Sequence, residues 1–256
     1  VGRVQTPTLG MVCERYWENR RFTPEAFWQL HIAVDGNNDG TVKLSSSEKW
    51  KEKEPATALY NKVKEIGAAT VTKAERKEKT EDTPLLYDLT TLQKEANAKH
   101  GFTAEQTLEI AQKLYEKKLI TYPRTGSRYI PEDVFAEIPK LLAFIGALPE
   151  WKGKVQAKVQ PTRRNVDGSK VTDHHALLVT GEKPLFLSKE DNTVYQMIAG
   201  RMIEAFSEKC VKDTTAVTAE CAGVEFIVKG SVIRQAGWRA VYGEEDKEEI
   251  SIPDWQ

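Results

Sequence analysis

The chain has 256 residues, of which 40% are hydrophobic and 29% charged, and a formal net charge of −1 at pH 7. This length allows one large domain or about two ordinary ones. No apolar run approaches the roughly 20 residues that a bilayer-spanning helix needs, so we expect a soluble, cytoplasmic protein rather than a membrane protein. Cys13, Cys210 and Cys221 show no Cys-x-x-Cys spacing. This excludes a disulfide framework and a zinc ribbon, and predicts reduced, structural thiols.

The first part of the chain is predicted to form strands. Trp28, Leu30, Ile32 and Val34 alternate with other residues before a turn at 35–38, which is the pattern of a half-buried strand. A strand, a helix and a further strand are predicted in turn over 42–44, 55–66 and 69–74. Strand-like alternation returns late in the chain over 214–218, 224–228 and 232–233.

Two helices are predicted in the middle of the chain. The first begins near Thr83-Pro84 and ends towards His100-Gly101, with an apolar face of Leu85, Leu89, Leu92 and Ala96. The second begins with a capping box formed by Thr103 and Gln106. A strand-like run at 119–121 follows, so the region resembles a helix-turn-helix with a wing, a shape that can lie against DNA.

A later helix is predicted to begin at Ser188, with Asp191 three residues further on. Its apolar stripe is expected to lie in the core and consists of Val194, Ile198, Met202 and Phe206. The helical middle therefore lies between two β-rich blocks. We expect an α+β fold in which a helical, winged-helix-like domain is inserted into a discontinuous β-rich domain.

The run LITYPRTGS at 119–127 holds a candidate nucleophile, Tyr122. A tyrosine hydroxyl with a pKa of about 10 attacks a phosphodiester poorly unless a cation assists it. Arg124, two residues further on, can hold two phosphate oxygens at once and offset the charge that develops there. Taken alone, this spacing is more typical of ordinary strand or loop surface.

Basic residues gather in two stretches that could line a phosphate backbone. The first holds Lys117, Lys118, Arg124 and Arg128 without a carboxylate. In the second, Asp167 opposes Lys152, Lys154, Lys158, Arg163, Arg164 and Lys170. Hydrated surface is the simpler reading of either stretch.

Asp173 precedes two histidines, His174 and His175, which are predicted to lie where a loop meets a regular element. An imidazole near the tyrosine could carry positive charge at neutral pH and stabilise the phosphate or the leaving oxygen. One structural and one exposed histidine is the alternative.

Four ordered segments resemble the type IA DNA topoisomerases, closest to their bacterial topoisomerase III branch. They are GRVQTPTL at 2–9, the stretch 84–130 around the tyrosine, DHHAL at 173–177, and the helix over 192–206. This resemblance implies that Tyr122 cleaves one DNA strand and becomes joined to its 5′ phosphate, with Arg124 and His174 in the active site. Strand passage would then need no ATP.

The resemblance also implies a groove that binds single-stranded DNA. Its expected contacts are Arg3, Gln5, Thr6, Arg15, Thr90 and Gln93, with Arg128 and His175 beside the tyrosine and histidine. The implied domains are a groove segment at 1–23, an arch made of 24–77 and 210–256, and the tyrosine domain at 78–209. We expect a monomer associated with the nucleoid, whose partner helicase the sequence does not identify.

The sequence departs from the family at one position of the tyrosine motif. The family continues Arg-Thr-Asp-Ser, and its aspartate is thought to orient the histidine, whereas Gly126 stands there in this chain. Asp173 is a possible substitute.

The chain opens inside a motif at Val1, so we expect a central segment of a longer enzyme. The family's toprim domain would supply the Mg²⁺ ligands and a glutamate acid–base, and no metal is expected on this segment, which should be inactive alone. A recombinase or relaxase is a weaker reading, because no three-histidine cluster or Arg-His-x-x-Arg set is visible. A non-catalytic winged-helix DNA-binding module is the other alternative.

Overall fold

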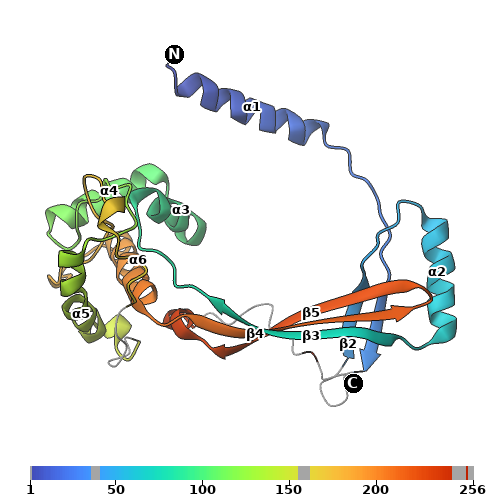
Figure 1. The fold of residues 1–256 in the computed structure, drawn as a ribbon. Coiled ribbons are helices and arrows are strands. Elements are labelled where there is room, and N and C mark those ends of the chain that lie inside the picture. The colour runs from blue at the N-terminus through green and yellow to red at the C-terminus, as the bar shows by residue number, and fades with distance from the viewer. Residues whose placement is uncertain (1, 36–40, 155–161, 244–251, 253–256) are drawn as a thin grey trace. The chain divides into compact units, whose positions relative to one another are not determined.

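The computed structural model describes residues 2–35, 41–154, 162–243 and 252, and confirms an α+β fold (Figure 1). The chain divides into two compact units. The first comprises Val1–Glu75, Thr215–Lys229 and Ile252–Gln256, and the second Arg76–Thr214 and Gly230–Ser251. The domain boundaries predicted from the resemblance stay a prediction. No helix among the described residues is long and apolar enough to cross a membrane.

The first unit begins with helix α1 (Gln5–Arg21), which buries none of its residues. Cys13 lies on it and is exposed, so the prediction of a structural role was wrong for this thiol, although Cys210 and Cys221 are buried. None of the three forms a disulfide. Helix α2 (Lys53–Ile66) ends at Gly67, whose φ of 64° closes the helix with a left-handed residue.

A five-stranded sheet has the order β1-β2-β5-β4-β3. Its strands are β1 (His31–Asp35), β2 (Thr41–Ser46), β3 (Thr70–Glu81), β4 (Cys210–Cys221) and β5 (Val224–Gln235). β1 and β2 pair antiparallel with Ile32 opposite Leu44, and β2 pairs antiparallel with β5 at Ser45 and Ile227. The strands predicted in the first and last parts of the chain are confirmed, but β3, β4 and β5 each extend over 12 residues, further than the alternation indicated.

The core of the first unit lies where the predicted alternation placed it. Its buried side chains are Leu30, Val42, Leu44, Val217, Ala219, Cys221, Val224, Phe226 and Val228. β4 turns into β5 through Ala222 and Gly223, which both have positive φ, 57° and 76°. Such a two-residue turn matches the right-handed twist of the flanking strands.

The second unit is mainly helical (Figure 1). Its α-helices are α3 (Leu89–His100), α4 (Ala104–Glu116), α5 (Glu132–Ala147) and α6 (Lys189–Phe206). Three short 3₁₀ helices accompany them: η1 (Pro149–Trp151), η2 (Gly168–Lys170) and η3 (Gly237–Val241). α6 packs against α3, α4, α5 and η3, and is buried from Val194 to Phe206 except at Gln196.

Two helix starts in this unit are confirmed and one is corrected. The Thr103–Gln106 capping box forms in both directions at α4, and the Ser188 side chain accepts from the Asp191 amide at α6. α3 begins at Leu89 rather than near Pro84, because the Asp88 side chain accepts from the Thr91 amide and caps the helix there.

The run at 119–121 forms an isolated antiparallel bridge between Ile120 and Val179 instead of the expected strand. Leu177 forms a similar bridge with Tyr87. The segment at 176–180 is therefore the extended chain against which the start of the tyrosine motif lies.

Candidate active site around Tyr122

The chain reaches Tyr122 through a tight turn at the end of α4. The Lys118 amide donates to Tyr115 O at 2.8 Å and the Leu119 amide to Leu114 O at 2.9 Å, which is the Schellman pattern of helix termination. Lys118 adopts a φ of 59° in this turn, a conformation that usually requires glycine. Leu119 and Leu114 are both buried, so the turn anchors the chain just before the tyrosine.

Tyr122 is half-buried between two other rings. Its ring centroid lies 4.5 Å from that of His174, with the planes inclined by 48°. Tyr115, on α4, meets Tyr122 edge to face at 5.3 Å. The structure therefore brings together the tyrosine and the first histidine, as the sequence predicts, and adds Tyr115, which the sequence analysis did not select.

Hydrogen bonds join the loop that carries Tyr122 to the loop that carries His174. The Thr125 hydroxyl donates to His174 O at 2.8 Å, and the Thr121 hydroxyl accepts from the Leu178 amide at 3.0 Å. The Leu89 amide donates to Thr125 O at 3.1 Å, so the first residue of α3 holds the same loop. These bonds fix the backbone on both sides of Tyr122.

Arg124 and His174 present exposed side chains next to this fixed loop. Within the described part of the chain, the Arg124 guanidinium makes no hydrogen bond or ion pair, so its donors are free for a ligand. His175 is half-buried, and its Nδ1 lies 2.7 Å from Ala176 O.

Gly126 is exposed, and no atom lies within 4 Å of the position where a Cβ would stand. Asp173 is exposed too, and among the described residues its carboxylate makes no hydrogen bond to His174. Asp173 therefore does not take the place of the family's aspartate in this arrangement.

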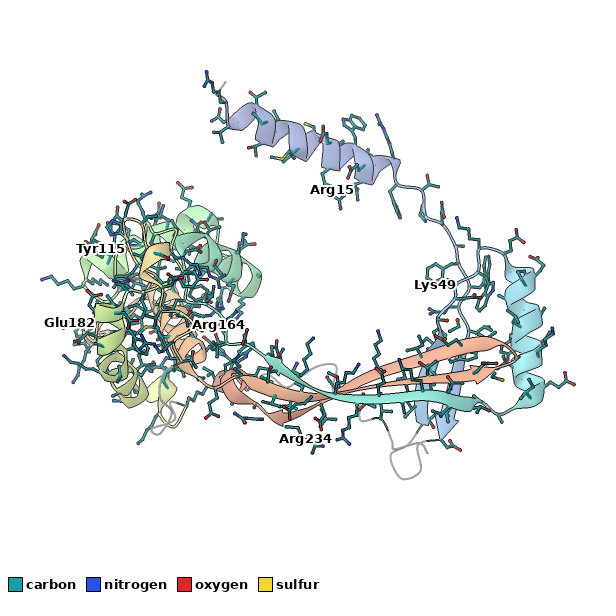
Figure 2. The ribbon with its side chains drawn as sticks, viewed as in Figure 1. Arg15, Lys49, Tyr115, Arg164, Glu182 and Arg234 are labelled. Carbon is teal, nitrogen blue, oxygen red and sulfur yellow. The ribbon has the colours of Figure 1, made fainter. Side chains whose placement is uncertain are left out.

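The other predicted DNA contacts fall into two groups. Arg3, Gln5, Thr6 and Arg15 are all exposed and belong to the first unit, and Arg15 pairs with Glu18 at 2.7 Å. Figure 2 shows the side chains of α1, Arg15 among them, projecting on all sides of the helix.

The second group lies in the same unit as Tyr122, and two of its members hold the fold. Thr90 is exposed. The side-chain amide of Gln93 donates to Ala104 O at 2.9 Å and so joins α3 to the start of α4. Arg128 donates to Leu86 O at 3.0 Å and to Leu85 O at 3.3 Å. Their binding of DNA stays a prediction.

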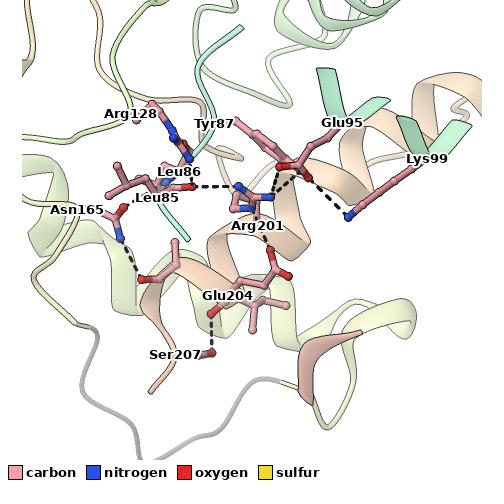
Figure 3. Close-up of polar contacts among 12 residues, drawn as sticks. Leu85, Leu86, Tyr87, Glu95, Lys99, Arg128, Asn165, Arg201, Glu204 and Ser207 are labelled. Carbon is pink, nitrogen blue, oxygen red and sulfur yellow. Dashed lines mark hydrogen bonds and ion pairs between the residues drawn. The ribbon is translucent and has the colours of Figure 1, made fainter. Parts of the chain in front are cut away.

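A buried charged cluster, not found from the sequence, joins α3 and α6 in the same unit (Figure 3). Arg201 is 7% exposed and donates to Glu95 at 2.5 Å, to Glu204 at 3.0 Å and to Leu85 O at 3.2 Å. The Tyr87 hydroxyl donates to the other Glu95 oxygen at 2.6 Å. The only signal in the sequence is that Arg201 and Glu204 interrupt the apolar stripe of α6.

The pKa values of the two carboxylates in this cluster shift in opposite directions. Burial raises the pKa of Glu204 above the ordinary glutamate value, although Arg201 opposes the shift. Burial acts in the same sense on Glu95, but the hydrogen bond from Tyr87 and the charge of Arg201 outweigh it and lower the pKa of Glu95. Burial also raises the pKa of Tyr87, so this tyrosine stays protonated as a donor.

The described residues offer no group of three or more His, Cys, Asp or Glu side chains that could hold a metal ion. The resemblance assigns the Mg²⁺ ligands to a toprim domain and none to these residues.

Known proteins similar to this chain agree on its family. A model of the DNA topoisomerase family matches residues 1–256. The DNA topoisomerase 3 of Bacillus subtilis is 35% identical over 257 residues, covering 97% of this chain and 35% of the relative. That of Bacillus cereus is 33% identical over 255 residues, covering 94% of this chain and 34% of the relative. The chain thus spans about a third of the length of these relatives.

A solved structure of full-length topoisomerase I from Thermotoga maritima has the same fold, with a TM-score of 0.73 and 23% identity. The match covers 100% of this chain and 42% of that one. With the family match over the whole chain, these findings show that the protein belongs to the bacterial type IA DNA topoisomerases and is similar to topoisomerase III.

Proposed function

We propose that this chain carries the nucleophile of a type IA topoisomerase that cuts and reseals single-stranded DNA. The observation that supports this most is the contact of Tyr122 with His174, whose ring centroids lie 4.5 Å apart. Arg124, two residues from Tyr122, has a guanidinium without a hydrogen bond or ion pair among the described residues. A nucleophile flanked by two groups that can hold phosphate oxygens is what phosphoryl transfer requires.

In the proposed reaction the Tyr122 hydroxyl loses its proton and its oxygen attacks a backbone phosphorus. The bond from phosphorus to the 3′ oxygen breaks, and that oxygen takes up a proton and leaves as a free 3′ hydroxyl. The 5′ phosphate stays on Tyr122, so attack by the 3′ hydroxyl reverses the step without ATP. Arg124 and His174 stabilise the charge on the phosphate oxygens.

The architecture proposed for the whole enzyme follows the family. Residues 78–209 form the winged-helix-like tyrosine domain, 24–77 and 210–256 form an arch, and 1–23 belong to a groove for single-stranded DNA. The arch moves to let a second strand pass, giving relaxation or decatenation by a monomer. Magnesium ligands and the acid–base glutamate lie in a toprim domain outside this chain, so the chain alone binds DNA and does not cleave it.

The test uses a protein of the relatives' full length that contains this chain. It is incubated with magnesium and a 3′-end-labelled single-stranded oligonucleotide and run on a denaturing gel. We expect a labelled protein band that disappears in Tyr122→Phe. Tyr115→Phe is the matched control, because it removes a hydroxyl from the ring packed on Tyr122 and should keep the band.

A full-length protein that binds the oligonucleotide and never forms the band would contradict the proposal. It would favour the non-catalytic winged-helix module, in which the glycine at position 126 marks a loss of activity. Magnesium-dependent relaxation by the 256-residue chain alone would contradict the proposal that cleavage needs the toprim domain.

A further inference from the structure

A polar cavity lies in the tyrosine-bearing unit, and none of the residues around Tyr122 line it. Its volume is about 340 Å³. The lining comes from three separate segments of the chain and consists of Asp82, Thr83, Thr162, Arg163, Arg164 and Lys209. We refer to it as the Thr83 cavity.

The cavity is rich in positive charge. Three of its lining side chains are cationic and one is a carboxylate, Asp82, which Lys209 contacts at 2.7 Å and Arg164 only at 3.9 Å. Arg163 pairs with Glu132 and lies 4.9 Å over the Phe135 ring, so its own charge is balanced outside the cavity. A single carboxylate is therefore shared by two cations, and the wall keeps unmatched positive charge.

One of the residues that line the cavity carries a hydroxyl without a partner. Thr83 is 1% exposed, and its Oγ1 makes no hydrogen bond with any described group. Buried hydroxyl groups are nearly always satisfied, so an unsatisfied one indicates a missing ligand or water. Because Thr83 lines a cavity of cations, an acceptor oxygen is the partner that fits.

The walls are held in place by buried contacts. Asn165 is fully buried, accepts from the Leu86 amide at 3.2 Å and donates to Ala205 O at 3.0 Å. It thereby fixes the segment of Arg163 and Arg164, the latter labelled in Figure 2. On the opposite side the Trp238 amide donates to Glu208 O at 3.0 Å, next to Lys209. A Cβ on Gly237 would lie 2.3 Å from Lys209 O, so this side is closely packed.

We propose that the Thr83 cavity binds a phosphate group of a nucleic-acid backbone, at a place separate from Tyr122. Arg164 and Lys209 hold the phosphate oxygens, and the Thr83 hydroxyl donates to one of them. When no phosphate is present, the Asp82 carboxylate pairs with Arg164 and Lys209, so it competes with phosphate for these two cations. The choice of nucleic acid as the source of the phosphate rests on the proposed function, whereas the binding of phosphate does not.

The first experiment measures binding of inorganic phosphate and pyrophosphate to the 256-residue chain by calorimetry. Thr83→Val keeps the shape and removes the hydroxyl, so it should weaken binding by about tenfold, as expected for a lost hydrogen bond to a charged group. Its unfolding midpoint without ligand should stay the same or rise, because the hydroxyl has no partner to lose. Asp82→Asn should tighten binding, which a purely structural ion cluster does not predict.

The second experiment identifies the source of the phosphate from the salt dependence of binding to a thymidine oligonucleotide. Each phosphate contact on a single strand contributes about 0.7 to the slope of log K against log salt. Arg164→Gln/Lys209→Gln removes the one phosphate contact proposed here and should lower the magnitude of the slope by roughly 0.7. Arg234→Gln/Lys73→Gln is the control. It also removes one arginine and one lysine charge, from exposed ion pairs with Asp213 and Glu75, and should leave the slope unchanged.

The double variant could lose phosphate binding while its salt slope with the oligonucleotide stays as in wild type. That result would overturn nucleic acid as the source of the phosphate, in favour of a free phosphate or nucleotide. Absence of phosphate binding, or equal binding by wild type and Thr83→Val, would overturn the site itself. Neither result depends on adduct formation by Tyr122, so the failure of this proposal is distinguishable from the failure of the proposed function.

Discussion

Thr125 and His174 are joined by a hydrogen bond from the Thr125 hydroxyl to the His174 carbonyl, at 2.8 Å. Thr125 is three residues beyond the proposed nucleophile, and His174 comes from a distant part of the sequence. The bond therefore sets the spacing between the two loops whose side chains meet at 4.5 Å. Thr125 acts on the site through the backbone of the histidine and is a positioning residue.

Replacement of Thr125 by valine should slow adduct formation by roughly 10- to 100-fold, because small displacements of reacting groups cost that much. Affinity for the oligonucleotide should be unchanged. Thr125→Ser keeps the hydroxyl and should restore the rate, which a loss of side-chain packing would not allow. An equal loss of rate in both variants would show that the methyl group, and not the hydrogen bond, is what matters.

Gly126→Asp introduces the carboxylate that the family has at this position. The backbone of Gly126 does not need a positive φ and the space around it is open. We therefore expect the unfolding free energy to change by less than about 0.5 kcal/mol in chemical denaturation. Gly126→Ala separates the effect of the carboxylate from that of a stiffer loop. A loss above about 1 kcal/mol in both variants would show that any side chain disturbs the loop.

Lys118 adopts a positive φ in the turn before Tyr122, which costs a side-chain-bearing residue about 1 kcal/mol. Lys118→Gly should relieve most of this cost and raise the unfolding free energy. Lys117→Gly, one residue earlier at a φ of −77°, should lower it. A lower stability in both variants, measured by denaturant titration, would contradict the strain.

The two carboxylates on Arg201 should give opposite pH dependence. The folded-state pKa of Glu95 is lowered, so its contribution to stability is present above the unfolded value of about 4.3 and is lost as the pH falls. The destabilisation caused by Glu95→Gln should accordingly shrink below about pH 4.

Burial raises the pKa of Glu204, so its contribution is present at low pH and is lost as the pH rises through the folded-state value. The difference between Glu204→Gln and wild type should therefore move in favour of the variant with rising pH. Unfolding curves collected from pH 3.5 to 7 measure both differences, and slopes of the same sign would contradict the assignment.

The sequence predicted elements well where a local signal decides them. The capping residues Thr103 and Ser188 marked two helix starts correctly, because capping depends on a few neighbouring groups. Helix α5 was not predicted, since Pro139 inside it breaks the helical pattern and only packing of Ile138, Leu142 and Ile145 compensates. The long strands β4 and β5 also exceeded their alternating runs, because pairing with neighbouring strands extends them.

The sequence named the candidate residues of the site, whose chemistry stays a prediction, and did not reveal their supports. Tyr122, Arg124 and His174 were found from the motifs that carry them, but their spacing in the fold was not. Tyr115 and Thr125 became visible only through contacts between distant segments. Arg201 was hidden for another reason, since a buried arginine looks like helix surface until its partners Glu95 and Glu204 are known.

Helix α1 has a consequence for amide hydrogen exchange. It extends over 17 residues and buries none of them among the described residues, with Leu9, Met11 and Val12 each at least 60% exposed. A helix of this length without a packed face is marginal in water, because tertiary packing normally supplies most of its stability. Its backbone amides should exchange with deuterium orders of magnitude faster than those of α6, whose stripe is buried. Slow exchange of the α1 amides would then indicate that another surface covers the helix.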